Sequence, residues 1–196
     1  DCSPSRSACA ASRCPDLPVE RALAPDAGPD RGDGPRAVAI RPLGAADLDT
    51  IGALQEASIV ALGAAAYSRA QLDAWARFGW HYRRKLLEDD GAFFVAERPD
   101  RLVGVGGWSP DSQAQGLAWL RYLFVHPDSA GQGIGRQLVE AVEADARGRG
   151  KAGFRVWSSL NAAGFYTALG YRRVRQGRWP VTGAIEIDYL LFAKDG

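Results

Sequence analysis

The sequence contains no methionine and only two histidines, and its three cysteines all lie within the first fourteen residues. Neither a histidine nor a second cysteine pair accompanies Cys2, Cys9 and Cys14 to complete a metal-ligand set. We therefore interpret these cysteines as three thiols on a terminal segment and predict no metal site.

Long hydrophobic runs and an excess of one charge are also missing. The longest nearly apolar stretch, Ile59–Tyr67, is far shorter than the roughly 20 residues that span a bilayer. No charged segment followed by an apolar one, as in a signal peptide, opens the sequence. The net charge of +1 supplies no field that attracts nucleic acid or an anionic membrane. We expect a cytoplasmic protein that binds neither nucleic acid nor a membrane.

Aromatic residues are absent from the first 35 positions, which are rich in Ala, Pro, Asp, Gly and Ser. Such a segment buries too little apolar surface to offset the entropy of ordering it. We predict a mobile N-terminal extension at residues 1–35 and a single folded domain at 36–196.

The hydrophobic pattern of the remaining chain predicts alternating strands and helices. Expected strands are 37–43, 92–97, 102–110, 117–125, 154–159, 171–177 and 184–193, and expected helices are 44–62, 68–90, 133–148 and 161–170. Ser68 is a candidate N-cap for the second helix. Strands outnumber helices, so the pattern favours an α/β (α+β) fold with a mixed sheet over a doubly wound parallel sheet.

The third expected helix has one apolar face. This face consists of Ile134, Leu138, Val139, Val142 and Ala146. The charged residues of the helix, Glu143 among them, are expected on its other sides.

Three glycines at alternate positions, Gly131, Gly133 and Gly135, precede this helix. The loop lacks the Lys-Ser/Thr pair of a nucleoside-triphosphate P-loop, and its spacing is not the GxGxxG of a dinucleotide fingerprint. No Ser, Thr, Asp or Asn directly precedes the helix to cap its first amides, so these donors are available to an anion such as a pyrophosphate. Arg136 could add a charge-assisted contact. Alternatively, the glycines only make a tight loop that lets the helix pack.

Two stretches, "LRYLFVHPDSAGQGIGRQLV" at 120–139 and "NAAGFYTALGY" at 161–171, resemble motifs of the GNAT superfamily of acyl-CoA-dependent N-acetyltransferases. The first stretch is similar to motif A of that family, a strand that ends in Val-x-Pro, a pyrophosphate loop and a helix. The second stretch is similar to motif B, with Asn161, Phe165 and Tyr166 at matching positions. Ala130 stands where the family usually has Gln or Arg. The resemblance covers roughly residues 36–194.

The resemblance implies a mostly antiparallel sheet of six to seven strands with about four helices, in which two parallel strands, 117–125 and 154–159, separate to form a cleft. Acetyl-CoA would lie in this cleft as the co-substrate, with its pyrophosphate on the glycine loop and its pantetheine arm along the first strand. The implied cofactor-binding residues are Leu123, Phe124, Val125, Gly131, Gln132, Gly133, Ile134, Gly135, Arg136, Asn161 and Phe165.

In this family the acetyl group passes directly from the thioester to an amine, and the leaving thiolate needs a proton. The motif assigns this proton transfer to Tyr166. The resemblance thus implies an N-acetyltransferase that acts on a primary amine, which we expect to belong to a small molecule. A non-catalytic acyl-CoA-binding or regulatory module on the same fold is the alternative, and a homodimer is left open.

The acceptor side is less defined, because the motif A strand carries Trp119, Arg121 and Tyr122 but no carboxylate. The candidate bases elsewhere are Glu97, His81, Asp111 and Glu186; alternatively, the base acts through water. By family resemblance, acceptor specificity is expected at residues 62–70 and 179–183. The aromatic residues Tyr67, Trp75, Trp80, Trp108 and Trp119 either line an apolar pocket or belong to the core.

Overall fold

The computed structural model describes residues 37–78 and 83–195, all within one compact unit, Pro35–Gly196. The expected mobile extension lies outside the described residues, as do His81 and Trp80. Among the residues described, no helix combines the length and the apolarity needed to cross a membrane.

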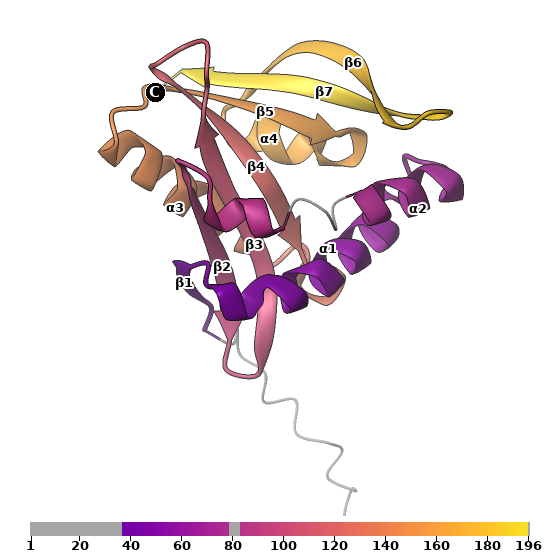
Figure 1. Ribbon diagram of the computed structural model, residues 1–196, viewed down its shortest axis with the longest axis horizontal. Helices are drawn as coiled ribbons and strands as arrows, with labels where there is room; N and C mark the ends of the chain where they lie inside the picture. The colour runs from indigo at the N-terminus through magenta and orange to yellow at the C-terminus, as the bar shows by residue number, and fades with distance from the viewer. Residues whose placement is uncertain (1–36, 79–82, 196) are drawn as a thin grey trace, which may run out of the picture. The chain divides into compact units, whose positions relative to one another are not determined.

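Within residues 37–78 and 83–195, seven strands form one sheet in the order β1-β2-β3-β4-β5-β7-β6 (Figure 1). Their bounds are β1 Ala39–Pro42, β2 Ala92–Arg98, β3 Arg101–Pro110, β4 Leu117–Val125, β5 Gly153–Ser159, β6 Arg172–Thr182 and β7 Ile185–Asp195. β4 and β5 pair in parallel, and the other neighbours pair antiparallel. The predicted mixed, mostly antiparallel sheet is confirmed.

In the part of the chain that the structure describes, four α-helices accompany the sheet: α1 Leu48–Gly63, α2 Arg69–Phe78, α3 Ile134–Gly148 and α4 Ala163–Ala168. The predicted second helix was too long, because α2 ends at Phe78 and Arg84–Leu87 forms a 3-10 turn. Leu86 of this turn packs against the α1 cluster around Ile51, so tertiary packing outweighs local helix propensity there. Ser68 caps α2 as predicted, since its Oγ accepts from the Gln71 amide and its own amide donates to Gln71 Oε1.

Alternate residues of β2 and β3 face different helices. Val95 and Val105 pack with Ile51 and Leu54 of α1. Leu102 joins the same cluster, whereas Ala96 and Val103, which directly follow Val95 and Leu102, pack with Ile134 and Leu138 of α3. Because successive side chains of a strand point to opposite faces, α1 and α3 cover opposite faces of the sheet (Figure 1). α2 packs on the β6–β7 hairpin through a cluster that contains Leu72, Val181 and Ile187.

The apolar face predicted for α3 is buried throughout, but the position expected for Glu143 was wrong. Glu143 is only 4 % exposed. Its carboxylate accepts from Tyr171 Oη at 2.7 Å, from Lys194 Nζ at 2.8 and 2.9 Å, and from Arg147 Nη2 at 2.8 Å. These donors come mainly from segments remote in sequence and compensate the burial of the charge.

Candidate functional site

A cavity of about 620 Å³ lies where β4 and β5 separate. Parallel pairing of these strands runs from Leu117 opposite Gly153 to Leu120 opposite Val156 and goes no further. β4 continues to Val125 and there pairs only with β3 in the described chain. The free edge of this segment offers backbone groups that a bound molecule can pair with.

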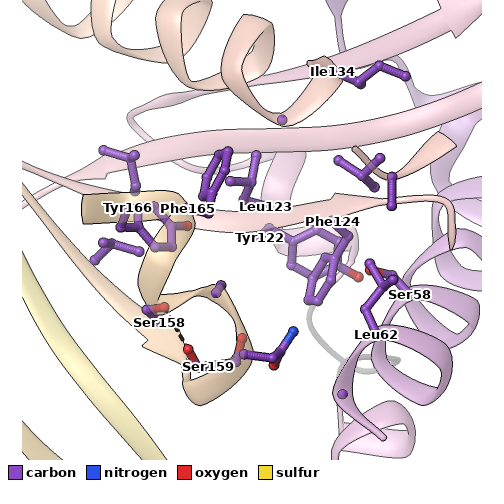
Figure 2. A pocket seen from close by; sticks show the side chains of 18 of the residues that line it. Ser58, Leu62, Tyr122, Leu123, Phe124, Ile134, Ser158, Ser159, Phe165 and Tyr166 are labelled. Carbon is purple, nitrogen blue, oxygen red and sulfur yellow. Dashed lines mark hydrogen bonds between the residues drawn. The ribbon is translucent and has the colours of Figure 1, made fainter. Parts of the chain in front are cut away.

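Residues of α1, α2, β4, α3, β5 and α4, and of the loops that precede α3 and α4, line the cavity. Figure 2 shows Phe165 and Tyr166 of α4 on one side and Ser58 and Leu62 of α1 on the other, with residues of β4 between them. The predicted site residues among its lining are Leu123, Phe124, Val125, Gly131, Gly133, Ile134, Gly135, Arg136, Asn161, Phe165 and Tyr166. One cavity therefore brings together segments that lie more than thirty positions apart in the sequence.

Gln132 is the exception, because it is not among the lining residues. Its side chain donates to the carbonyl oxygen of Asp128 at 3.0 Å and accepts from the guanidinium of Arg98. The side chain of Gln132 thus ties the loop to Arg98 of β2 and to Asp128, and only the backbone of Gln132 remains for the predicted role.

The glycine loop has the conformation that its residues permit. Gly131 and Gly133 have φ angles of +75° and +80°, and a Cβ on either would meet no atom within 4 Å. Gly133 is the N-cap of α3 and, lacking a side chain, makes no side-chain cap hydrogen bond. The first amides of α3 therefore face the cavity mouth without a capping side chain, at the positive end of the helix dipole.

Gly135 has a different environment. A Cβ at this position would lie 3.2 Å from Cε2 and Cζ of the Phe165 ring. The absence of a side chain lets α4 approach the first turn of α3, so motif B packs directly on motif A. This contact fixes one wall of the cavity.

Tyr166 is buried, with only 4 % of its surface exposed, yet it lines the cavity. Its ring packs against those of Phe165, Tyr171 and Phe192, with centroids 5.0, 5.5 and 5.9 Å away. Burial raises the pKa of the phenol above its ordinary value. The hydroxyl therefore stays protonated at neutral pH, which is the state of a proton donor.

Tyr122 is a second tyrosine of the cavity that the sequence did not single out as a site residue. Two residues of β4, Tyr122 and Leu123, lie opposite Gly106 of β3, and Tyr122 adopts a φ of +60° at this bulge. Burial raises its pKa to about 12, and its hydroxyl donates to Gln55 of α1. Because the hydroxyl proton of Tyr122 is already donated to Gln55, it is less available for transfer to a bound molecule than the hydroxyl proton of Tyr166.

The candidate bases do not gather in the cavity. Glu97 pairs with Arg41 at 2.7 Å, and Glu186 lies 3.7 Å from Arg178. Asp111 lines a second, smaller cavity and not this one. His81 lies outside the described residues. None of the described residues that line the first cavity is an Asp or a Glu.

The aromatic residues divide between pocket and core. Trp75 lines the cavity, whereas Trp108 is 1 % exposed and donates through Nε1 to Asp145 at 2.8 Å. Tyr67 is buried, and its hydroxyl donates to the Asp188 carbonyl and accepts from the Leu160 amide. Trp108 therefore belongs to the core, one of the two alternatives, because its side of β3 faces α3.

A cavity between two separating parallel strands, with an uncapped glycine loop beside it and a protonated tyrosine in its wall, is typical of the GNAT acetyltransferase fold. The family model of the GNAT acetyltransferase domain matches residues 89–173. A crystal structure of a GCN5-related N-acetyltransferase from Rhodopseudomonas palustris is 27% identical and superposes with a TM-score of 0.70, over 81% of this chain and 95% of that one. Residues 89–173 thus match a GNAT acetyltransferase domain, and the fold around them is that of a GCN5-related N-acetyltransferase.

Two further relatives extend this comparison. An uncharacterised N-acetyltransferase of Methanocaldococcus jannaschii is 30% identical over 104 residues, which are 50% of this chain and 45% of the relative. The chain spans about half of the length of the curated relatives that it matches. The fold is also that of an N-acetyltransferase from Thermoplasma acidophilum, crystallised with coenzyme A, at a TM-score of 0.65 and 22% identity over 82% of this chain and 99% of that one.

Proposed function

We propose that this protein transfers the acetyl group of acetyl-CoA directly to a primary amine of a small molecule. The observation that carries the proposal is that one cavity joins the uncapped start of α3, the unpaired edge of β4 and the protonated hydroxyl group of Tyr166. An anion, an extended amide-bearing arm and a leaving thiolate would each meet a suitable partner in that order along the cavity.

The residues fit coenzyme A. Open space beside Gly131 and Gly133 lets a pyrophosphate approach the backbone amides, where the helix dipole favours negative charge. Arg136 is exposed, lines the cavity and adds a positive charge at the same end. The complex of the Thermoplasma acidophilum relative with coenzyme A supports the same ligand here. Backbone groups of Leu123 and Val125 would pair with the amides of the pantetheine arm.

Bound acetyl-CoA supplies an acetyl group activated as a thioester. The amine nitrogen forms a bond to the acetyl carbon while the carbon–sulfur bond breaks, and Tyr166 gives its proton to the departing sulfur. A phenol with a reference pKa of about 10 is a weaker acid than a thiol with a pKa of about 8.5, and burial raises the pKa of Tyr166 further, so the proton stays on Tyr166 until the carbon–sulfur bond breaks. The departing thiolate forms in the same cavity, where desolvation also raises the pKa of its conjugate acid and makes the transfer possible. The amine loses its surplus proton to water, since no carboxylate among the described residues lines the cavity.

The missing carboxylate also favours the second candidate, a module that binds acyl-CoA without catalysis. The two functions differ only after the cofactor has bound. Acetyl-CoA should raise the melting temperature of the full chain in both cases, because a ligand that binds only the folded state stabilises it. A panel of amines, with detection of released thiol, should then show acetyl-CoA consumption that depends on the amine. Stabilisation without thiol release from any amine would favour the binding module, and no stabilisation would contradict both.

A further inference from the structure

A second cavity of about 450 Å³ adjoins the first. The two cavities share four lining residues, Leu120, Arg121, Tyr122 and Trp157. The rest of the second cavity's lining comes from the end of β3 and the loop that follows, and from one further residue each of β4 and β5. These residues are Pro110, Asp111, Ser112, Gln113, Trp119 and Arg155. A molecule held there would reach the first cavity through the four shared residues.

Arg121 and Trp157 occupy equivalent places at this junction. Leu120 and Val156 are the last paired residues of β4 and β5, and Arg121 and Trp157 are the next residue on each strand. The opening between the strands thus begins between one cation and one indole ring. Any acceptor that approaches the thioester from the second cavity passes these two side chains.

Aromatic rings form one wall of the approach. Trp157 is 60 % exposed, which is unusual for so large an apolar side chain. Its ring contacts those of Trp119 and Tyr189, with centroids 5.2 and 5.7 Å away. The Trp119 indole is held by its Nε1 hydrogen bond to Asp111 at 2.8 Å. A ring that stacks on Trp157 would therefore meet a fixed aromatic surface.

The charges of the second cavity leave one cation uncompensated. Asp111 accepts from the amides of Gln113 and Ala114 at 2.8 and 3.1 Å and lies 3.4 Å from Arg155 Nη1. Its carboxylate is thus fully engaged and balances Arg155. Arg121 is exposed and has no hydrogen bond or ion pair with any residue in 37–78 or 83–195. The junction therefore favours an anionic group beside an aromatic ring.

We propose that the second cavity binds the acceptor, and that the acceptor is an aromatic α-amino acid. Its carboxylate pairs with Arg121, its ring packs on Trp157 and Trp119, and its amine, on the same carbon as the carboxylate, faces the opening between β4 and β5. This proposal rests on the proposed acetyl transfer and names its substrate class.

The ion pair with Arg121 also helps to deprotonate the amine. In free solution the carboxylate of an amino acid stabilises its neighbouring ammonium group. When that carboxylate pairs with a guanidinium, its stabilising effect is cancelled and the neutral amine becomes easier to form. Arg121 would thus partly replace the base that the strand lacks, without taking the proton itself.

Binding tests the proposal without catalysis. Calorimetric titration of the full chain, saturated with coenzyme A, should show that L-phenylalanine binds more tightly than either 2-phenylethylamine, which lacks the carboxylate, or L-alanine, which lacks the ring. Arg121→Gln should weaken L-phenylalanine by about 10-fold or more, the range of one charge-assisted contact, and leave 2-phenylethylamine unchanged. Trp157→Ala should weaken the binding of both aromatic ligands, L-phenylalanine and 2-phenylethylamine. Arg172→Gln, an equal charge change on exposed β6 away from both cavities, should weaken neither.

The proposal is overturned if 2-phenylethylamine or L-alanine binds as tightly as L-phenylalanine, or if Arg121→Gln has no effect. It is also overturned if sedimentation shows a dimer that Trp157→Ala dissociates, because a second copy then covers this surface. The protein could bind acetyl-CoA and release thiol with other amines while L-phenylalanine neither binds nor causes thiol release. That result would refute this substrate class and leave the proposed function intact. A failure to bind acetyl-CoA would instead refute the proposed function.

Discussion

The indole Nε1 of Trp119 donates to Asp111 Oδ2 at 2.8 Å, so the carboxylate of Asp111, which lines the second cavity, holds an aromatic ring in place. Hydrogen bonds from the Gln113 amide, and then from Trp119 and Ala114, lower the pKa of Asp111, and the charge of Arg155 adds to this effect. A carboxylate with a lowered pKa is ionised throughout the neutral range and is a poor base.

We therefore expect Asp111→Asn to leave the shape of the pH profile of kcat/KM unchanged between about pH 6 and pH 9. The asparagine oxygen can still accept from Trp119, so KM for the acceptor should change only a few-fold. Glu186→Gln, which removes the same charge away from both cavities, gives the matched control. Loss of an ionisation from the Asp111→Asn profile would identify Asp111 as the base after all.

Removing the hydroxyl group of Tyr166 should affect the chemical step and spare cofactor binding. Tyr166→Phe should lower kcat by about 100-fold or more, the size of a lost general acid, with the Kd of coenzyme A unchanged. Steady-state kinetics and calorimetry measure these two quantities separately. Tyr171→Phe removes a buried hydroxyl group that bonds Glu143 and lines neither cavity, and it should cost stability while kcat is retained. Equal kcat values for the Tyr166→Phe and unaltered proteins would remove Tyr166 from the mechanism.

The raised pKa of Tyr166 makes a separate prediction about pH. A phenol with an ordinary pKa would begin to lose its proton near pH 10 and stop acting as an acid. Because burial raises the pKa of Tyr166, its protonated state persists through that range. In the unaltered protein, kcat measured at saturating amine should therefore not fall as the pH rises from about 8 to about 10. A decline with a midpoint below about 10 would mean that Tyr166 ionises more easily than its environment indicates.

The sequence predicted most of the residues that line the first cavity because the determinants there are local. The glycine spacing, the absence of an N-cap side chain at Gly133 and the Phe165-Tyr166 pair each act within one turn or loop. The second cavity could not be predicted in this way. Whether Arg121 and Trp157 flank the same opening depends on the β4–β5 register and on where pairing ends, and neither can be read from the sequence of one strand.

Glu143 illustrates the same limit within a helix. On the helix alone, a glutamate beside the apolar face reads as a solvated charge, because its partners Tyr171 and Lys194 lie 28 and 51 positions away. In the described residues, the ammonium group of Lys194 has hydrogen bonds only to the carboxylate of Glu143, so Glu143→Gln would leave this charge without its ion-pair partner. The substitution should lower the free energy of unfolding by about 3 kcal/mol. Urea denaturation measures this loss. Glu140→Gln, at an exposed position on the same helix, should cost less than about 0.5 kcal/mol.

The role of the left-handed backbone conformation in the glycine loop can be tested with two Gly→Ala substitutions, because the added Cβ meets no atom in either case. Gly133 has a φ of +80°, whereas Gly148 in the last turn of α3 has no positive φ, and a Cβ at either site meets no atom within 4 Å. Gly133→Ala should therefore cost about 1–2 kcal/mol of stability through backbone strain and weaken coenzyme A binding. Gly148→Ala should be neutral or stabilising by up to about 1 kcal/mol and leave binding unchanged. Similar losses from both substitutions would rule out the left-handed conformation as the cause.

The last prediction concerns Ala130, which is exposed, lines the cavity and brings no polar side chain to the loop. Ala130→Arg would add a guanidinium group at the proposed pyrophosphate site, where a charge-assisted contact is worth about a 10-fold gain in affinity at low salt. The gain should shrink as salt screens the pair, and it should persist with dephospho-coenzyme A, which keeps the pyrophosphate. Ala144→Arg adds the same charge at an exposed position of α3 outside the cavity. Equal tightening by both variants would attribute the gain to net charge, and no tightening by Ala130→Arg would place the pyrophosphate away from this loop.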